Sequence, residues 1–110
     1  MGTAPAPLLS AAFPELAREL DLLLRDSAET DLADQVTSLR ILDRCRCGDT
    51  FCSTFYTGPR PEGAYPLGRR TVSLDPERGC LNVDVVDRSI VCVEVLDRDE
   101  TRERLLRVCP

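Results

Sequence analysis

The chain has 110 residues, the length of a single domain, because a chain of this size buries roughly two-thirds of its unfolded surface in one core. Hydrophobic residues (43%) and charged residues (30%) are balanced as in folded proteins and unlike disordered ones. The net charge of −5 argues against nucleic-acid binding, which depends on neutralising phosphates, and no apolar run reaches the ~20 residues of a membrane-spanning helix. We therefore expect neither nucleic acid nor a membrane among its partners.

The first nine residues contain Pro5 and Pro7 among small residues and show no periodic apolar face. This composition predicts a flexible leader over residues 1–9, followed by a single α+β domain over residues 10–110. The leader lacks the basic start and apolar run of a secretory signal peptide, so we expect a cytoplasmic protein. In that reducing compartment the six cysteines would be thiols, metal ligands or redox groups rather than structural disulfides.

Two helices are expected at the start of the domain. Residues 11–25 repeat apolar side chains every three or four positions, which is the pattern of an amphipathic helix. Residues 26–39 place Leu32, Val36 and Leu39 on one helical face and predict a shorter second helix. Both helices would cover the apolar side of a sheet formed by the rest of the chain.

A tight reversal between two strands is expected at residues 47–52, where the sequence CGDTFC contains turn-forming Gly and Asp. With the Asp-Thr pair at its tip, Cys47 lies opposite Cys52 and Cys45 lies opposite Thr54. This register places all three thiols on one face of the hairpin.

Residues 58–68 contain three prolines and three glycines, which predicts a long surface loop rather than a helix or strand. Arg60 within this loop, and Arg69 and Arg70 just after it, form a basic group. Guanidinium forks match carboxylates and phosphates, so these residues are candidates for binding an acidic partner peptide or a phosphate. Since no glycine-rich phosphate cradle accompanies them, partner recognition is the favoured role.

The clearest strand signals lie in residues 71–97, which contain two runs of alternating branched aliphatic residues. The expected antiparallel pairs, around a loop of Asp87, Arg88 and Ser89, are Leu81 with Val95, Val83 with Val93 and Val85 with Val91. Residues 70–74 should form the preceding strand, and a short helix should follow Asp97. The sequence therefore predicts an α+β fold with two N-terminal helices, an antiparallel meander of about five strands and a short C-terminal helix.

Three cysteines within eight residues, Cys45, Cys47 and Cys52, are candidate metal ligands. Zinc takes four ligands tetrahedrally, with sulfur at about 2.3 Å, and the fourth would be a later cysteine: Cys80 first, or else Cys92 or Cys109. Against zinc, the chain has no second pair of closely spaced cysteines, and alternate residues of an extended strand lie about 6–7 Å apart. We therefore expect either no cofactor or zinc, with unligated thiols as the favoured interpretation.

The absence of His removes the usual general base and excludes serine–histidine and cysteine–histidine catalysis. The negative charge, a wide sheet surface and the lack of a catalytic set favour a non-enzymatic module that binds another protein, such as an adaptor, inhibitor or immunity-type partner. One alternative is a zinc-stabilised module built on the cysteine hairpin. A further alternative, the least favoured, is a thiol redox protein with a reversible Cys47–Cys52 disulfide. No Cys-x-x-Cys pair at a helix start supports it.

Overall fold

The computed structural model describes residues 5–59 and 68–110. Within them the helices are α1 (Leu9–Ala12), α2 (Pro14–Asp26), α3 (Thr30–Ala33) and α4 (Asp99–Val108), with a 3-10 helix, η1 (Val36–Ser38). The strands are β1 (Asp43–Arg44), β2 (Phe55–Tyr56), β3 (Arg70–Leu74), β4 (Cys80–Val86) and β5 (Ser89–Leu96). They form one antiparallel sheet in the order β1-β2-β5-β4-β3, so the predicted α+β fold is confirmed.

The strand order places β5 at the centre of the sheet, between β2 and β4. Strands β3, β4 and β5 form a meander, but β2 pairs with β5 instead of β3, so the expected meander does not run through all five strands. The β2–β5 register joins Phe55 to Val93 and Tyr56 to Cys92. The pairing turns Phe55 into the core, where its side chain is fully buried.

The hairpin of β4 and β5 carries the branched aliphatic residues on the inner face of the sheet. Its register joins Leu81 to Val95 and Val83 to Val93, as predicted. The third predicted pair is wrong, because a bulge between Asp84 and Val85 shifts Val85 onto Ile90. The loop is also one residue shorter than expected, because Ser89 begins β5. Its two residues, Asp87 and Arg88, have φ of 50° and 67°. Positive φ at both positions is typical of the two-residue turns whose twist matches that of the flanking strands.

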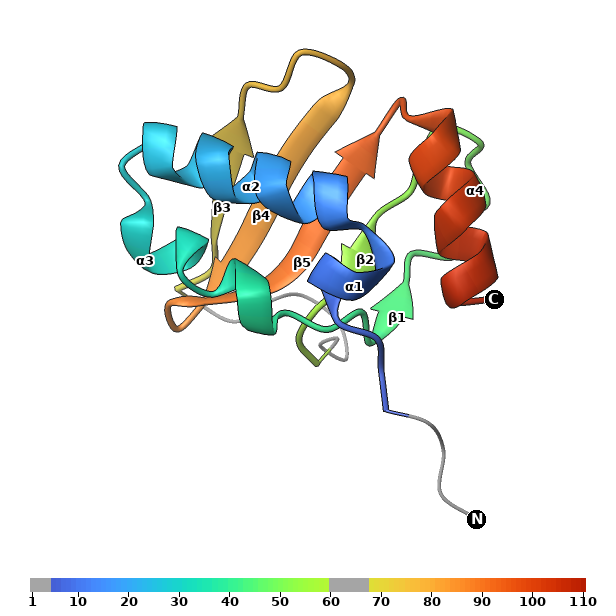
Figure 1. The fold of residues 1–110 in the computed structure, drawn as a ribbon, viewed down its shortest axis with the longest axis horizontal. Coiled ribbons are helices and arrows are strands. Elements are labelled where there is room, and N and C mark those ends of the chain that lie inside the picture. Colours follow the sequence, from blue (N-terminus) through green and yellow to red (C-terminus); the bar gives the residue numbers. More distant parts are fainter. Residues whose placement is uncertain (1–4, 60–67) are drawn as a thin grey trace.

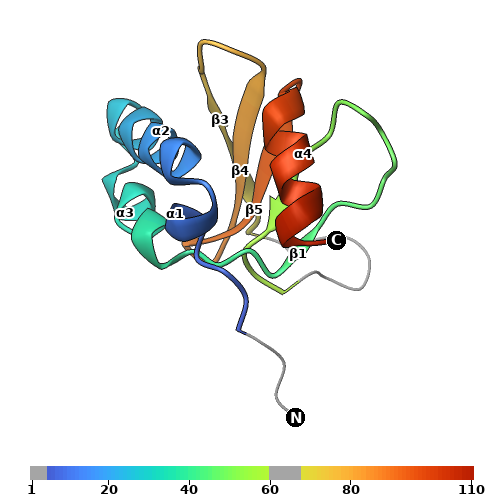
Figure 2. The same ribbon diagram turned by 45° about the vertical axis from the view of Figure 1, so that its right-hand side comes forward.

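The helices lie on one face of the sheet, with α2 across the strands, α1 and α3 beside it, and α4 near the β1–β2 end (Figures 1 and 2). Their apolar side chains join the inner face of the sheet in a single core that includes Leu9, Leu20, Leu24, Phe55, Val83, Val93 and Leu105. The longest of these helices, α2, has 13 residues. No helix in the described part of the chain is long and apolar enough to cross a bilayer.

The two predicted N-terminal helices are each divided. Phe13 has φ of −138° and separates α1 from α2, so that Pro14 begins a new helix instead of lying inside one. Ala28 has φ of 61°, which ends α2 and leaves only α3 and η1 helical in the second predicted segment, residues 26–39. Burial still follows the predicted apolar pattern, because Leu32 is 2% exposed.

The packed domain begins earlier than residue 10. Residues 1–4 of the predicted leader lie outside the described residues. Pro7 accepts a hydrogen bond from the Ile41 N–H at 2.9 Å, and the Leu9 N–H donates to the Leu39 carbonyl at 2.8 Å. Leu9 is fully buried, so the end of the expected leader is part of the core.

Replacing Phe55 by Ala should lower the free energy of unfolding by about 3–5 kcal/mol, because it leaves a cavity in the core and removes the ring that stacks on Phe13 at a centroid distance of 6.3 Å. The matched control is Phe51→Ala, since this ring is 48% exposed and its loss should change stability by about 0.5 kcal/mol or less. Urea denaturation of both variants measures the difference. Equal stabilities for the two variants would contradict the β2–β5 pairing.

Candidate metal centre

The three clustered cysteines follow or precede the short strands β1 and β2. These strands pair Asp43 with Tyr56 and Arg44 with Phe55, and the Cys45 N–H then donates to the Thr54 carbonyl at 2.8 Å. The predicted placement of Cys45 opposite Thr54 is therefore confirmed. Strand β1 has already ended at Arg44, and the chain bends at Cys47.

The return arm of this hairpin is fixed to the central strand. Cys52 forms a bridge with Leu96, and the Ser53 N–H donates to the Val95 carbonyl at 2.9 Å. At the tip, Gly48 has φ of 82°, a left-handed conformation that glycine adopts without the steric cost of a side chain. This turn brings Cys47 back towards the other two cysteines.

The sulfur atoms of Cys45, Cys47 and Cys52 all lie within 4.8 Å of one another. The expected spacing of 6–7 Å for Cys45 and Cys47 is wrong, because β1 ends at Arg44 and the two cysteines do not lie on an extended strand. Zinc–sulfur bonds of about 2.3 Å at tetrahedral angles separate the sulfurs by about 3.8 Å. The separations between the three sulfurs therefore exceed those of a zinc site by at most about 1 Å.

The three cysteines open on a small cavity of about 30 Å³. A space of this size holds an ion or a single water, since one water needs a cavity of about 10–15 Å³. The cavity is lined by Arg44, Cys45, Cys47, Gly48, Asp49, Cys52, Arg102, Leu105 and Leu106. Helix α4 therefore forms one wall of the thiol cluster, and the hairpin forms the other.

The environment gives Cys52 and Cys47 opposite shifts in pKa. Partial burial is the largest influence on Cys52 and raises its pKa, but hydrogen bonds from the Thr54 hydroxyl and N–H and from the Cys47 and Cys45 thiols outweigh it and lower the pKa overall. For Cys47, the Asp49 N–H is the largest influence and lowers the pKa, whereas Cys45, burial and Cys52 together raise it to about 11. Of these two thiols, Cys52 is therefore the one that loses its proton more readily.

Thr54 is a site residue that the sequence did not single out. Its side chain is 8% exposed, and its hydroxyl contacts both Cys52 and the Val95 N–H, the latter at 3.3 Å. The predicted register already placed Thr54 opposite Cys45 and two residues from Cys52. The Thr54 hydroxyl could therefore have been predicted, from this register, to donate a hydrogen bond to the thiol cluster.

The other three cysteines lie apart from the cluster, and all six are free thiols. Cys80 pairs with Leu96 on the side of β5 opposite to Cys52, so two strand spacings, about 10 Å, separate their backbones. The structure thus does not bring Cys80 into the metal group. Cys92 is 4% exposed, and burial, followed by the charges of Asp84 and Glu94, raises its pKa to about 12.

Among the described residues, the arginines predicted to bind a partner already contact other side chains of the chain. Arg60 lies outside these residues. Arg70 donates to both carboxylate oxygens of Glu29, at 3.0 and 2.8 Å, so its guanidinium fork is already paired. Arg69 contacts the Thr71 hydroxyl at 3.5 Å.

Comparison of the chain with protein-family models, with curated proteins and with solved structures gave no match.

Near neutral pH, an alkylating reagent should modify Cys52 before Cys47, although Cys47 is the more exposed of the two. The reason is that the thiolate is the reactive species, and a lowered pKa increases its population. Thr54→Val removes a hydroxyl donor and should slow the modification of Cys52. Mass spectrometry of timed reactions measures the order, and faster labelling of Cys47 would contradict it.

Proposed function

We propose that this protein binds a thiophilic metal ion, zinc, through Cys45, Cys47 and Cys52. The observation that supports this proposal is the convergence of three sulfurs within 4.8 Å beside a cavity large enough for one ion. Thiolate sulfur suits zinc, a borderline-soft ion, in tetrahedral sites. A cytoplasmic location, which we also propose, would keep these cysteines reduced and able to bind the ion.

The charges around the cluster favour a bound ion. Three thiolates and Zn²⁺ carry a net charge of about −1, and the guanidinium groups of Arg44 and Arg102 line the same cavity. Their positive charges would offset the remaining negative charge. The described residues supply three ligands at this point, and water or a further ligand atom would take the fourth position.

A bound ion would stabilise the β1–β2 hairpin at the edge of the sheet. Strands β1 and β2 have two residues each, and a hairpin of this length is marginal without added constraints. The ion would join Cys45 and Cys47 on one arm to Cys52, which is anchored on β5. Binding would then couple to folding, so the site acts as a clamp on residues 45–52.

A second candidate function is protein binding, which is favoured by a groove between α2 and the turn that contains residues 75–78. The redox alternative uses the same sulfurs as the zinc site. Cys47 and Cys52 are close enough for that interpretation, and a resident metal ion would protect them from oxidation.

The purified chain should bind about one equivalent of zinc, and its melting temperature should fall when a chelator removes the ion. Cys47→Ser should weaken zinc binding by more than about tenfold, because it removes a ligand, whereas Cys80→Ser should leave binding unchanged. Isothermal titration and metal analysis measure both effects. Binding should also weaken at lower pH, since protons compete for the thiolates.

Two results would contradict the zinc site. One is a metal content below about half an equivalent together with a melting temperature that does not respond to chelation. The other is equal zinc affinity in the Cys47→Ser and Cys80→Ser variants. A Cys47–Cys52 disulfide that forms under mild peroxide despite added zinc would favour the redox alternative instead.

A further inference from the structure

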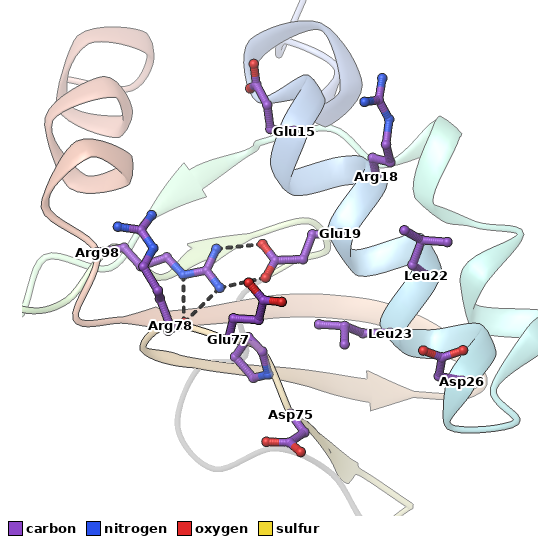
Figure 3. A pocket seen from close by; sticks show the side chains of 11 residues that line it. Glu15, Arg18, Glu19, Leu22, Leu23, Asp26, Asp75, Glu77, Arg78 and Arg98 are labelled. Atoms are coloured by element: carbon purple, nitrogen blue, oxygen red, sulfur yellow. Dashed lines mark hydrogen bonds and ion pairs between the residues drawn. The ribbon is translucent and has the colours of Figure 1, made fainter.

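A groove of about 630 Å³ separates α2 from the turn that joins β3 to β4 (Figure 3). Its α2 side carries Leu22 and Leu23, and its opposite side carries Pro76 between Asp75 and Glu77. The groove lies apart from the thiol cluster, with which it shares no lining residue. Its volume is in the range of sites that bury several side chains or a small ligand.

The two sides of the groove are tied together by a buried arginine. Arg98 is 7% exposed and donates to both carboxylate oxygens of Glu19 on α2, at 2.6 and 2.8 Å. The same guanidinium donates to the Arg78 carbonyl in the turn, at 3.1 and 2.9 Å, as the dashed lines of Figure 3 show. These hydrogen bonds hold the groove in a preformed shape, which lowers the ordering cost of binding.

The groove exposes apolar surface. Leu22 is 56% exposed, more than any other large hydrophobic side chain that the structure describes. It lies one helical turn from both Arg18 and Asp26, so these three side chains share one face of α2. An exposed leucine beside Leu23 and Pro76 gives the groove an apolar floor with a polar rim, the anatomy of a protein-binding site.

The unpaired charges on the rim are mostly negative. Glu15, Glu19, Arg78 and Arg98 have ion-pair partners, but no ion pair within residues 5–59 and 68–110 involves the other charged lining groups: Arg18, Asp26, Asp75 and Glu77. Three free carboxylates against one guanidinium leave a net charge of −2. An occupant with positive charge would therefore complement the rim.

We propose that this groove docks a segment of a partner protein that carries an apolar side chain flanked by Arg or Lys. The apolar side chain would cover Leu22 and Leu23, and the cationic groups would pair with Asp26, Asp75 and Glu77. Nucleic acid is disfavoured here because its phosphates would face the unpaired carboxylates. The surface is independent of the metal site.

A display library of random peptides, selected against the full chain, tests this docking surface and does not require the partner to be identified first. The enriched peptides should carry net positive charge and at least one large apolar residue, and salt should weaken their binding. Leu22→Ser, and Asp75→Asn combined with Glu77→Gln, should each weaken binding by about tenfold. The matched controls Leu42→Ser and Glu103→Gln, both on exposed residues outside the groove, should have no effect.

Three outcomes would overturn the proposal: no enrichment above background, enrichment of acidic peptides, or peptides that bind the groove variants as tightly as the unaltered chain. Light scattering adds a fourth, because a dimer that dissociates in Leu22→Ser would show that a second copy occupies the groove. The Cys47→Ser variant should bind the selected peptides normally, which separates this surface from the metal site.

Discussion

The pairing of β2 with β5 is the contact on which the arrangement of the molecule depends. It places Phe55 against Val93 on the inner face of the sheet, where the Phe55 ring stacks on Phe13 beneath the helices. The same pairing continues to the bridge between Cys52 and Leu96, which fixes one arm of the cysteine hairpin. Burial of one aromatic ring and alignment of the thiol cluster are therefore consequences of a single strand register.

Much of the fold could be predicted from local pattern. Alternation fixes the face of each residue in β4 and β5, so the pairs at Leu81 and Val83 followed from burying the branched side chains. The bulge near Val85 could not be predicted, because it depends on the left-handed conformations of Asp87 and Arg88, residues that show no glycine signal. The β2–β5 pairing was also missed, since alternation says nothing about which distant strand becomes the neighbour.

Part of the candidate site could also be predicted from local sequence pattern. The register of the hairpin followed from a turn at its tip, and it correctly placed Cys45 opposite Thr54. The approach of the sulfurs was underestimated, because β1 ends at Arg44, before Cys45 and Cys47, and local propensity did not predict so short a strand. The proposed docking groove had no sequence signal, since the Arg98–Glu19 pair that shapes it joins residues far apart in the chain.

The central claim, that three thiolates converge on one ion, is tested most directly by X-ray absorption at the zinc edge of the chain loaded with one equivalent of zinc. We expect a first coordination shell with three sulfur atoms at about 2.3 Å and one lighter atom at about 2.0 Å. A shell that contains only oxygen or nitrogen would contradict it.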